Sequence, residues 1–117
     1  MKKLNLINQS KNKKLAEHVL VADTIFSQMK GLLGRKELPH HEVLWIKAGG
    51  TIHTWFMNFP IDIVFVDKNL CVRAIHKNVK PWRIVFPTWK AKSVFEFTGG
   101  KLHDSSITLG DQLYVGD

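Results

Sequence analysis

The sequence predicts a mainly β fold, a compact antiparallel barrel or sandwich-like single domain over residues 1–117 with one α-helix near the N-terminus, at about residues 24–34. Three observations support this prediction. The chain of 117 residues is long enough for one hydrophobic core. Short runs of β-branched and aromatic residues recur between turn-forming Gly, Pro and Asn residues. Apolar residues recur at helical spacing in one segment only.

The N-terminal third is expected to hold two strands and the helix. The runs KLNLIN (3–8) and EHVLVAD (17–23) have the composition of strands, and the polar residues between them predict a hairpin connection. Asp23 or Thr24 can cap the helix, and Gly34 can end it. Between these limits, the apolar side chains at helical spacing are Ile25, Phe26, Met29, Leu32 and Leu33.

Strands dominate the rest of the chain. Each is bounded by Gly, Pro or polar residues, and we expect them at 42–48, 51–58, 61–67, 70–76, 93–100 and 111–116. The turn Asp67-Lys68-Asn69 makes 61–76 a hairpin, which is the best-defined local element. A long connection with two prolines occupies residues 77–92.

Composition limits the class of protein. A hydrophobic content of 44% and a charged content of 23% are typical of a folded globular domain. Cys71 is the only cysteine, so an internal disulfide is excluded. The basic start is not followed by the apolar run of a signal peptide, and no run of ~18 apolar residues exists to cross a membrane. We therefore expect a soluble, basic, cytoplasmic protein, and no motif predicts a cofactor or a metal.

A basic region spans residues 68–92. It holds seven Lys and Arg residues and no carboxylate, and Trp82, Phe86 and Trp89 lie among them. Cations and rings in this pattern are compatible with nucleic acid, through its phosphates and bases, or with an anionic membrane surface. The simpler interpretation is a solvated basic face whose aromatic side chains point inward.

Asp62 is the least expected residue of the apolar hairpin. In a strand it shares a face with Val64 and Val66, where a buried carboxylate without partners would be costly. We expect it to accept hydrogen bonds from backbone amides of the 53–58 segment, which would pin that aromatic-rich stretch against the hairpin. The alternative is a carboxylate at the floor of a pocket, serving as a ligand anchor or as a general acid or base.

A cleft beside Asp62 is the candidate site. If residues 51–58 are extended, His53, Trp55 and Met57 share one face, and Glu96 lies between two phenylalanines of a later strand. The candidate binding residues are His53, Trp55, Met57, Asp62 and Glu96. Asp62 and His53 are also the candidate catalytic residues, although no hydroxyl lies in a nucleophile motif. Convergence of the two acids and the histidine would suggest a metal, but their spacing matches no known ligand pattern.

Four segments together resemble one family. Their order and spacing are similar to those of the DUF192 (UPF0127) family, a domain of unknown function: GLLGR (31–35), IHTWFMNFPIDIVFVD (52–67), VFEFTGG (94–100) and ITLGDQL (107–113). The resemblance covers about residues 18–116. It implies a small, mainly β protein of bacteria or archaea without an established activity. Relatives often carry arginines where this chain has Gln28 and Lys30, and Pro-Ala-Gly where it has Thr98-Gly99-Gly100, which weakens any role that depends on those residues.

These observations support three hypotheses about function. The first is a small binding or accessory domain with a cleft around His53, Asp62 and Glu96, whose partner is a small molecule or another protein. The second is a hydrolase or other enzyme that uses Asp62 and His53 as acid and base. The third depends on charge alone and is nucleic-acid binding through residues 68–92.

Overall fold

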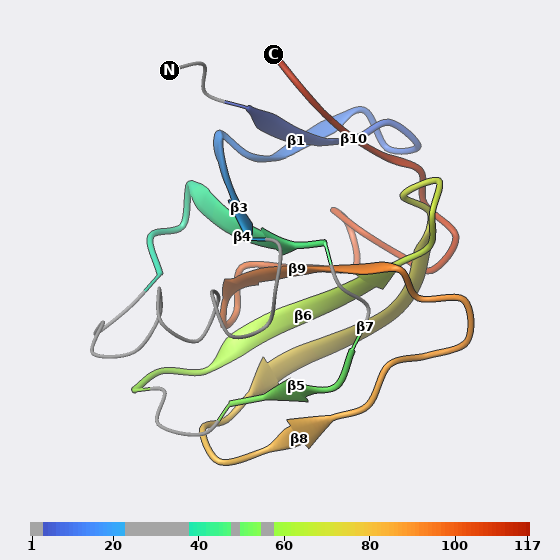
Figure 1. Ribbon diagram of the computed structural model, residues 1–117. Coiled ribbons are helices and arrows are strands. Elements are labelled where there is room, and N and C mark those ends of the chain that lie inside the picture. Colours follow the sequence, from blue (N-terminus) through green and yellow to red (C-terminus); the bar gives the residue numbers. More distant parts are fainter. Residues whose placement is uncertain (1–3, 23–37, 48–49, 55–57) are drawn as a thin grey trace.

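The computed structural model describes residues 4–22, 38–47, 50–54 and 58–117, and this part of the chain is built from β-strands (Figure 1). In chain order they are β1 (Asn5–Asn8), β2 (Lys13–Ala16), β3 (His18–Ala22), β4 (Glu42–Ile46), β5 (Ile52–His53), β6 (Ile61–Val66), β7 (Val72–Val79), β8 (Ile84–Val85), β9 (Ser93–Thr98) and β10 (Leu113–Gly116). Within these ranges, no helix has the length and apolar character needed to cross a membrane.

Five strands form the central sheet, in the order β3-β4-β9-β6-β7. β3 and β4 pair in parallel, and the other neighbours pair antiparallel. Every residue of β6 is buried, as expected of a strand that is covered on both faces. The most apolar run of the sequence thus lies inside the sheet rather than at its edge.

Two smaller sheets cover the central sheet on opposite sides. The three-stranded sheet β10-β1-β2 lies above it in Figure 1, and the two-stranded ribbon β5-β8 lies below it. Alternation along the strands sends Val64 into the upper core, where Leu6 also packs, and Ile63 into the lower core with Ile52 and Val85. We call these the first core and the second core. The domain is therefore three β layers with a core in each gap.

The predicted antiparallel barrel or sandwich with an N-terminal helix is wrong. The described strands do not close into a barrel but form three sheets, one of which contains a parallel pair. The described residues contain no helix, and the segment 24–34 for which a helix is predicted lies outside them. The mainly β character is confirmed. Strand pairing cannot be predicted from local patterns because it depends on contacts between distant segments, whereas the alternation of apolar and polar residues is a local property.

One predicted hairpin is confirmed and another is paired differently. β6 and β7 pair antiparallel about the turn at residues 67–69, as predicted. At the N-terminus, β1 pairs with β2 and not with β3, because the chain turns at residues 9–12, where Asn12 takes a φ of 53°. β2 does not look like a strand in the sequence, since two of its four residues are exposed lysines.

Candidate functional site

Asp62 is fully buried, and three backbone N–H groups donate to its carboxylate. Oδ1 accepts from the amide of Asn78 at 2.8 Å and from that of Gly100 at 3.2 Å, while Oδ2 accepts from the amide of Leu102 at 2.9 Å. Hydrogen bonds to an ionised acceptor are stronger than neutral ones, at ~1.5–3 kcal/mol each. This carboxylate therefore joins β6 to β7 and to the chain that follows β9.

A β-bulge provides one of these donors. Two residues of β7, Lys77 and Asn78, lie opposite the single residue Asp62 of β6. The extra residue interrupts the ladder of backbone hydrogen bonds, and Asn78 takes a φ of 53°. Its N–H group donates to Asp62 in place of a ladder partner. The carboxylate whose burial looks costly thus satisfies an amide that the bulge frees.

The predicted burial of Asp62 is confirmed, but its donors among the described residues are not the predicted ones, and residues 55–57 of the predicted segment lie outside the described residues. Each donor that the structure shows lies after the hairpin turn, and none belongs to residues 53–58. Gly99 belongs to the same junction, because a Cβ atom there would lie 2.7 Å from the Asn78 Oδ1 and 2.9 Å from the Pro60 carbonyl oxygen. Only glycine allows so close an approach without displacing the backbone of Pro60.

Glu96 is also fully buried, but on the other face of the sheet. In the pairing of β6 with β9, Asp62 lies beside Phe97 of the first core, and Ile63 of the second core lies beside Glu96. Because successive residues of a strand point to opposite faces, Asp62 and Glu96 do not share one site. Burial raises the pKa of Glu96 to about 8, so this carboxyl group is mostly protonated at neutral pH.

The three described candidate residues lie in different parts of the fold. Asp62 and Glu96 lie on opposite faces of the central sheet, and His53 lies in the β5-β8 ribbon, where it pairs with Ile84. Trp55 and Met57 lie outside the described residues. Across the described ranges, no group of three or more His, Cys, Asp or Glu side chains is placed to hold a metal ion. The geometry therefore does not bring the two acids, Asp62 and Glu96, into one site.

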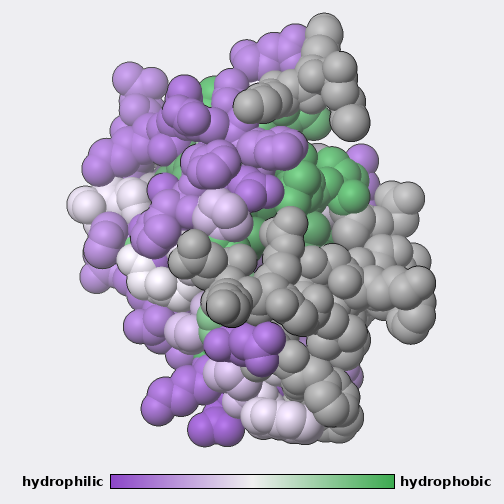
Figure 2. Space-filling view, turned by 90° about the vertical axis from the view of Figure 1, so that its left-hand side faces the viewer, coloured by the Kyte–Doolittle hydropathy of each residue, from purple (hydrophilic) through white to green (hydrophobic). Residues whose placement is uncertain are grey.

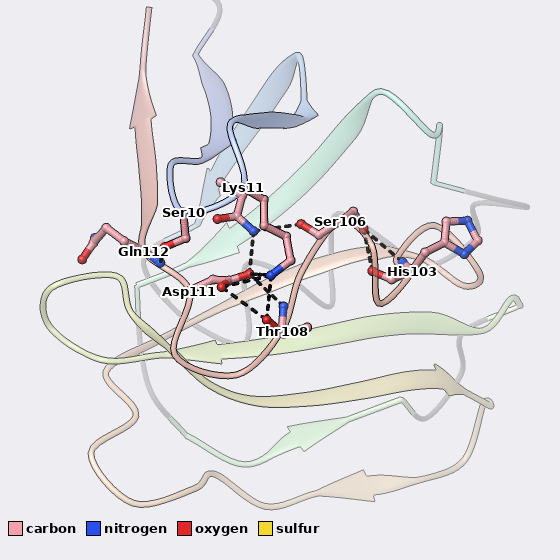
Figure 3. A network of polar contacts seen from close by, with 8 residues as sticks. Ser10, Lys11, His103, Ser106, Thr108, Asp111 and Gln112 are labelled. Atoms are coloured by element: carbon pink, nitrogen blue, oxygen red, sulfur yellow. Dashed lines mark hydrogen bonds and ion pairs between the residues drawn. The ribbon is translucent and has the colours of Figure 1, made fainter.

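Asp111 is the centre of a polar network that sequence reasoning missed (Figure 3). Its carboxylate accepts hydrogen bonds from the Asn8 amide group and the Thr108 backbone N–H, both at 2.8 Å, and Lys11 Nζ lies 2.9 Å from its Oδ2. The contacts with Asn8 and Lys11 join residues about one hundred positions apart in the sequence, so no local pattern around Asp111 could reveal them. The network fastens the turn after β1 to the start of β10.

The charge of Asp111 depends on this network. Burial raises its pKa, but hydrogen bonds from Asn8, Lys11 and the Thr108 amide, with the positive charge of Lys11, lower it to about 2. A depressed carboxylate pKa contributes stability that is present above the ordinary value of 3.8 and is lost as the pH falls toward 2. The network therefore stabilises the fold against acid unfolding, and it does not form an open binding site.

The aromatic side chains of residues 80–92 are exposed to solvent. The exposed fraction is 58% for Trp82, 71% for Phe86 and 76% for Trp89. The interpretation that these aromatic side chains point inward is therefore wrong. The segment also holds four Lys and Arg residues, all exposed, and it runs through β8 along the lower right of Figure 1 to the start of β9. We call residues 80–92 the basic aromatic segment.

Thr54 fixes the beginning of this segment. Its buried hydroxyl donates to the Lys80 carbonyl at 2.7 Å and accepts from the Arg83 N–H at 2.8 Å. Its backbone N–H donates to the Arg83 carbonyl at 2.9 Å, and its carbonyl accepts from the Trp82 N–H at 3.1 Å. The hydroxyl that could have been a nucleophile is therefore engaged in holding a turn.

Two residues of the segment adopt an unfavourable backbone conformation. Trp82 and Lys90 both take a φ of 64°, in the left-handed region that glycine and asparagine favour. A bulky residue there costs about 1 kcal/mol or more relative to its usual conformation. Since neither side chain is buried, core packing does not explain the choice of residue. At Trp82, the hydrogen bonds between Thr54 and the turn hold the backbone in this conformation.

The side of the molecule near β3 offers no comparable feature. β3 is an edge strand of the central sheet, and Val21 is 47% exposed. In Figure 2, the coloured residues of this side are mostly hydrophilic, and hydrophobic atoms gather in one area. We place no site on this side.

Comparison with known proteins defines the relationship of the chain. It is 29% identical to a UPF0127 protein of Pyrococcus horikoshii over 92% of this chain and 96% of that one, and 31% identical to a UPF0127 protein of Pyrococcus abyssi over 92% and 94%. A crystal structure of a protein of unknown function from Novosphingobium aromaticivorans has a similar fold, with a TM-score of 0.79 at 24% identity over 95% of this chain and 82% of that one. A structure from Sinorhizobium meliloti, titled a putative transcription regulator, has a TM-score of 0.75 at 21% identity over 96% and 91%.

The family model described as "Uncharacterized ACR, COG1430" matches residues 6–115. That range includes the Asp62 junction, formed by Asp62 and the amides of Asn78, Gly100 and Leu102. It also includes the Asp111 network and the basic aromatic segment. The resemblance recognised in the motifs is thereby confirmed, and the chain belongs to the DUF192 family of uncharacterised function.

Proposed function

We propose that this protein is a binding domain that holds single-stranded nucleic acid on its basic aromatic segment. The observation that carries the proposal is the exposure of Phe86 and Trp89, at 71% and 76%, in a segment without a carboxylate. An exposed ring gains nothing from the core, but it can stack on an unpaired base, which is worth ~1–3 kcal/mol per base. Duplex bases are already stacked, so the rings favour a single strand.

The cations of the segment fit the same partner. Arg83 and Lys90 each directly follow an exposed tryptophan. A single strand alternates bases with phosphates in the same way, so that one ring and one cation can serve each nucleotide. A membrane-inserting loop would instead gather its apolar side chains at one tip, with its cations behind them. The interleaving therefore favours nucleic acid over an anionic membrane surface.

This proposal agrees with the predicted class, a small binding domain, but it places the binding site on the basic aromatic segment. The cleft predicted around His53, Asp62 and Glu96 is not carried forward, because the two acids face different cores. The proposed acid–base enzyme has no supporting observation either, since three backbone amides donate to Asp62. Nucleic-acid binding, the third hypothesis from the sequence, becomes the preferred one because the aromatic rings of the segment face outward.

The test is the affinity for a labelled oligo(dT) of about 20 nucleotides, longer than the ~4–16 nucleotides that one stacking surface covers. We expect binding that weakens steeply between ~50 and ~200 mM salt, as phosphate contacts require. Phe86→Ala and Trp89→Ala should each weaken it about 5- to 100-fold, since each removes one stacked base. Tyr114→Ala is the matched control, because Tyr114 is an exposed ring (48%) on β10.

Two results would overturn the proposal. One is the absence of oligonucleotide binding at low salt. The other is equal affinity for the wild type and both segment variants. Vesicles of phosphatidylserine and phosphatidylcholine form a second arm. Binding to vesicles that is lost in Trp89→Ala, without binding to oligo(dT), would reassign the segment to a membrane surface and refute nucleic-acid binding.

A further inference from the structure

A small cavity lies beside the basic aromatic segment, between two parts of the chain. Its volume is about 320 Å³, and the described residues that line it are Asp67, Lys68, Asn69, Lys90 and Lys92. The first three form the turn between β6 and β7, and the other two belong to the end of the basic aromatic segment. Three of the five lining residues are lysines, so the cavity gathers positive charge from two segments that are distant in the sequence.

Hydrogen bonds from backbone N–H groups fix both walls of the cavity. In the turn, Asp67 Oδ1 accepts from the N–H groups of Asn69 at 2.9 Å and Cys71 at 3.0 Å. On the other wall, the Lys92 N–H donates to the carbonyl of Val66 at 2.8 Å. The end of β6 is therefore tied directly to the second wall. Because neither wall depends on a ligand for its position, the lysine backbones are already in place before anything binds.

Lys90 is positioned by a tight turn. The Ala91 N–H donates to the Thr88 carbonyl at 3.2 Å, and Lys90, the third residue of this turn, takes a φ of 64°. Glycine or asparagine is the usual residue there. Lys90 lines the cavity from this turn, while its neighbour Trp89 remains the most exposed large hydrophobic side chain of the described residues. One turn therefore places a lysine at the cavity and a ring in solvent.

The charges of the cavity are not neutralised within the described part of the chain. Lys68, Lys90 and Lys92 are all exposed, and none of them forms an ion pair among the described residues. Asp67 is the single carboxylate of the lining, and one of its oxygens is occupied by two amides. Three ammonium groups and one carboxylate leave a net positive charge. Clustered ammonium groups bind phosphate as point charges.

We infer that the cavity of Lys68, Lys90 and Lys92 is a phosphate subsite, which holds the phosphate of the nucleotide whose base stacks on Trp89. The inference rests on the proposed function for the identity of the ligand, but the subsite itself requires only a phosphate group. The cavity lies at the lower end of the size range of ligand sites, which fits one phosphate with its sugar better than a large ligand. The three lysines and the ring thus form a unit that binds one nucleotide.

Inorganic phosphate is the direct probe. Amide chemical shifts are followed in ¹H–¹⁵N spectra during a phosphate titration, with sodium chloride at the same ionic strength as the reference. We expect shifts confined to residues 67–71 and 88–92. The double variant Lys68→Gln/Lys92→Gln should weaken phosphate binding at least tenfold. The matched control Lys13→Gln/Lys14→Gln removes the same charge from β2, where both lysines are exposed, and should bind phosphate as the wild type does.

Phosphate shifts that spread over all surface lysines, or an equal loss in both double variants, would overturn the subsite. The outcome for oligo(dT) is read separately. Oligonucleotide binding without localised phosphate shifts would refute the subsite and leave the proposed function standing. Localised phosphate shifts without oligonucleotide binding would refute the proposed function and leave the subsite standing. Vesicles with phosphatidylserine identify a lipid headgroup as the source of the phosphate, if they bind through the same two lysines and oligo(dT) does not.

Discussion

The Asp62 junction and the basic aromatic segment are unusual in opposite ways. At the junction a carboxylate lies where apolar side chains are expected, and three amides donate to it. In the segment, rings lie in solvent among cations that form no ion pairs within the described residues. The burial of a polar group that makes all of its hydrogen bonds is accounted for by its role in the fold. Single exposed apolar side chains are common, but several of them gathered among cations are typical of an interaction surface.

This difference teaches where a function should be sought in such a chain. The residues that stand out most in the sequence, Asp62 and Glu96, lie in the interior, and Asp62 is engaged in holding three chain segments together. The residues that looked ordinary, Phe86 and Trp89, are the ones that the fold leaves in solvent. If the comparison is right, substitutions in the two regions should affect different properties, stability in one and binding in the other.

The largest effect is expected at the junction. Asp62→Ala leaves the amides of Asn78, Gly100 and Leu102 without their acceptor, and it should lower the free energy of unfolding by about 3–5 kcal/mol. Asp62→Asn keeps the volume but turns an amide donor toward backbone donors, so it should also destabilise. Urea denaturation measures both. A loss of less than about 1 kcal/mol in Asp62→Ala would mean that the junction is not a structural centre.

An intermediate effect that depends on pH is expected at Glu96. Its pKa is about 8 in the folded protein and near 4.5 when unfolded. Folding therefore favours the protonated acid, whose contribution to stability is present below pH 4.5 and is lost as the pH rises toward 8. Glutamine resembles the protonated form and does not titrate. Glu96→Gln should therefore match the wild type near pH 5 and exceed it by several kcal/mol at pH 8–9.

Urea midpoints of the two proteins across this pH range measure the effect. Parallel curves for Glu96→Gln and the wild type would show that the second core stabilises the charged form of Glu96. The contrast between the two faces of the sheet would then be lost.

The smallest effect on stability is expected in the basic aromatic segment. Phe86→Ala and Trp89→Ala remove side chains that are mostly exposed, so each should change the free energy of unfolding by no more than about 0.5 kcal/mol. The same variants should have the largest effect on oligonucleotide affinity. A loss of 2 kcal/mol or more of stability in either variant would show that the ring packs within the protein, and the two regions would no longer differ.

Much of the central sheet could be predicted from local patterns. The continuous apolar run of 61–66 indicated a strand buried on both faces, and the turn at 67–69 indicated its hairpin with the following strand. Alternation also placed Asp62 on the face of Val64 and Val66. The same rule, applied to β9, would have separated Asp62 from Glu96 if the register of the two strands had been known. The register between two strands cannot be predicted from a single sequence.

The site was harder to predict for a related reason. The donors to Asp62 are backbone amides 16, 38 and 40 residues away, and an amide carries no mark of residue type that a pattern could reveal. The direction of Phe86 and Trp89 was equally hidden, because a ring between prolines and lysines can point either way until the layers pack. Lys68 and Lys92 look like solvated charges in the sequence, and their meeting at one cavity depends on how the 67–69 turn lies against residues 90–92.

By itself the sequence determined that this chain is mainly β, that β6 lies inside a sheet, that residues 68–92 are basic, and that its motifs are those of the DUF192 family. The first three properties follow from composition and short-range alternation, which depend on neighbours in the chain, and the family follows from the resemblance of the motifs. Only the tertiary structure decided which strands pair, which amides hold Asp62 and which aromatic side chains stay in water. Those outcomes follow from the packing of three layers against each other, where contacts between distant segments outweigh local preference.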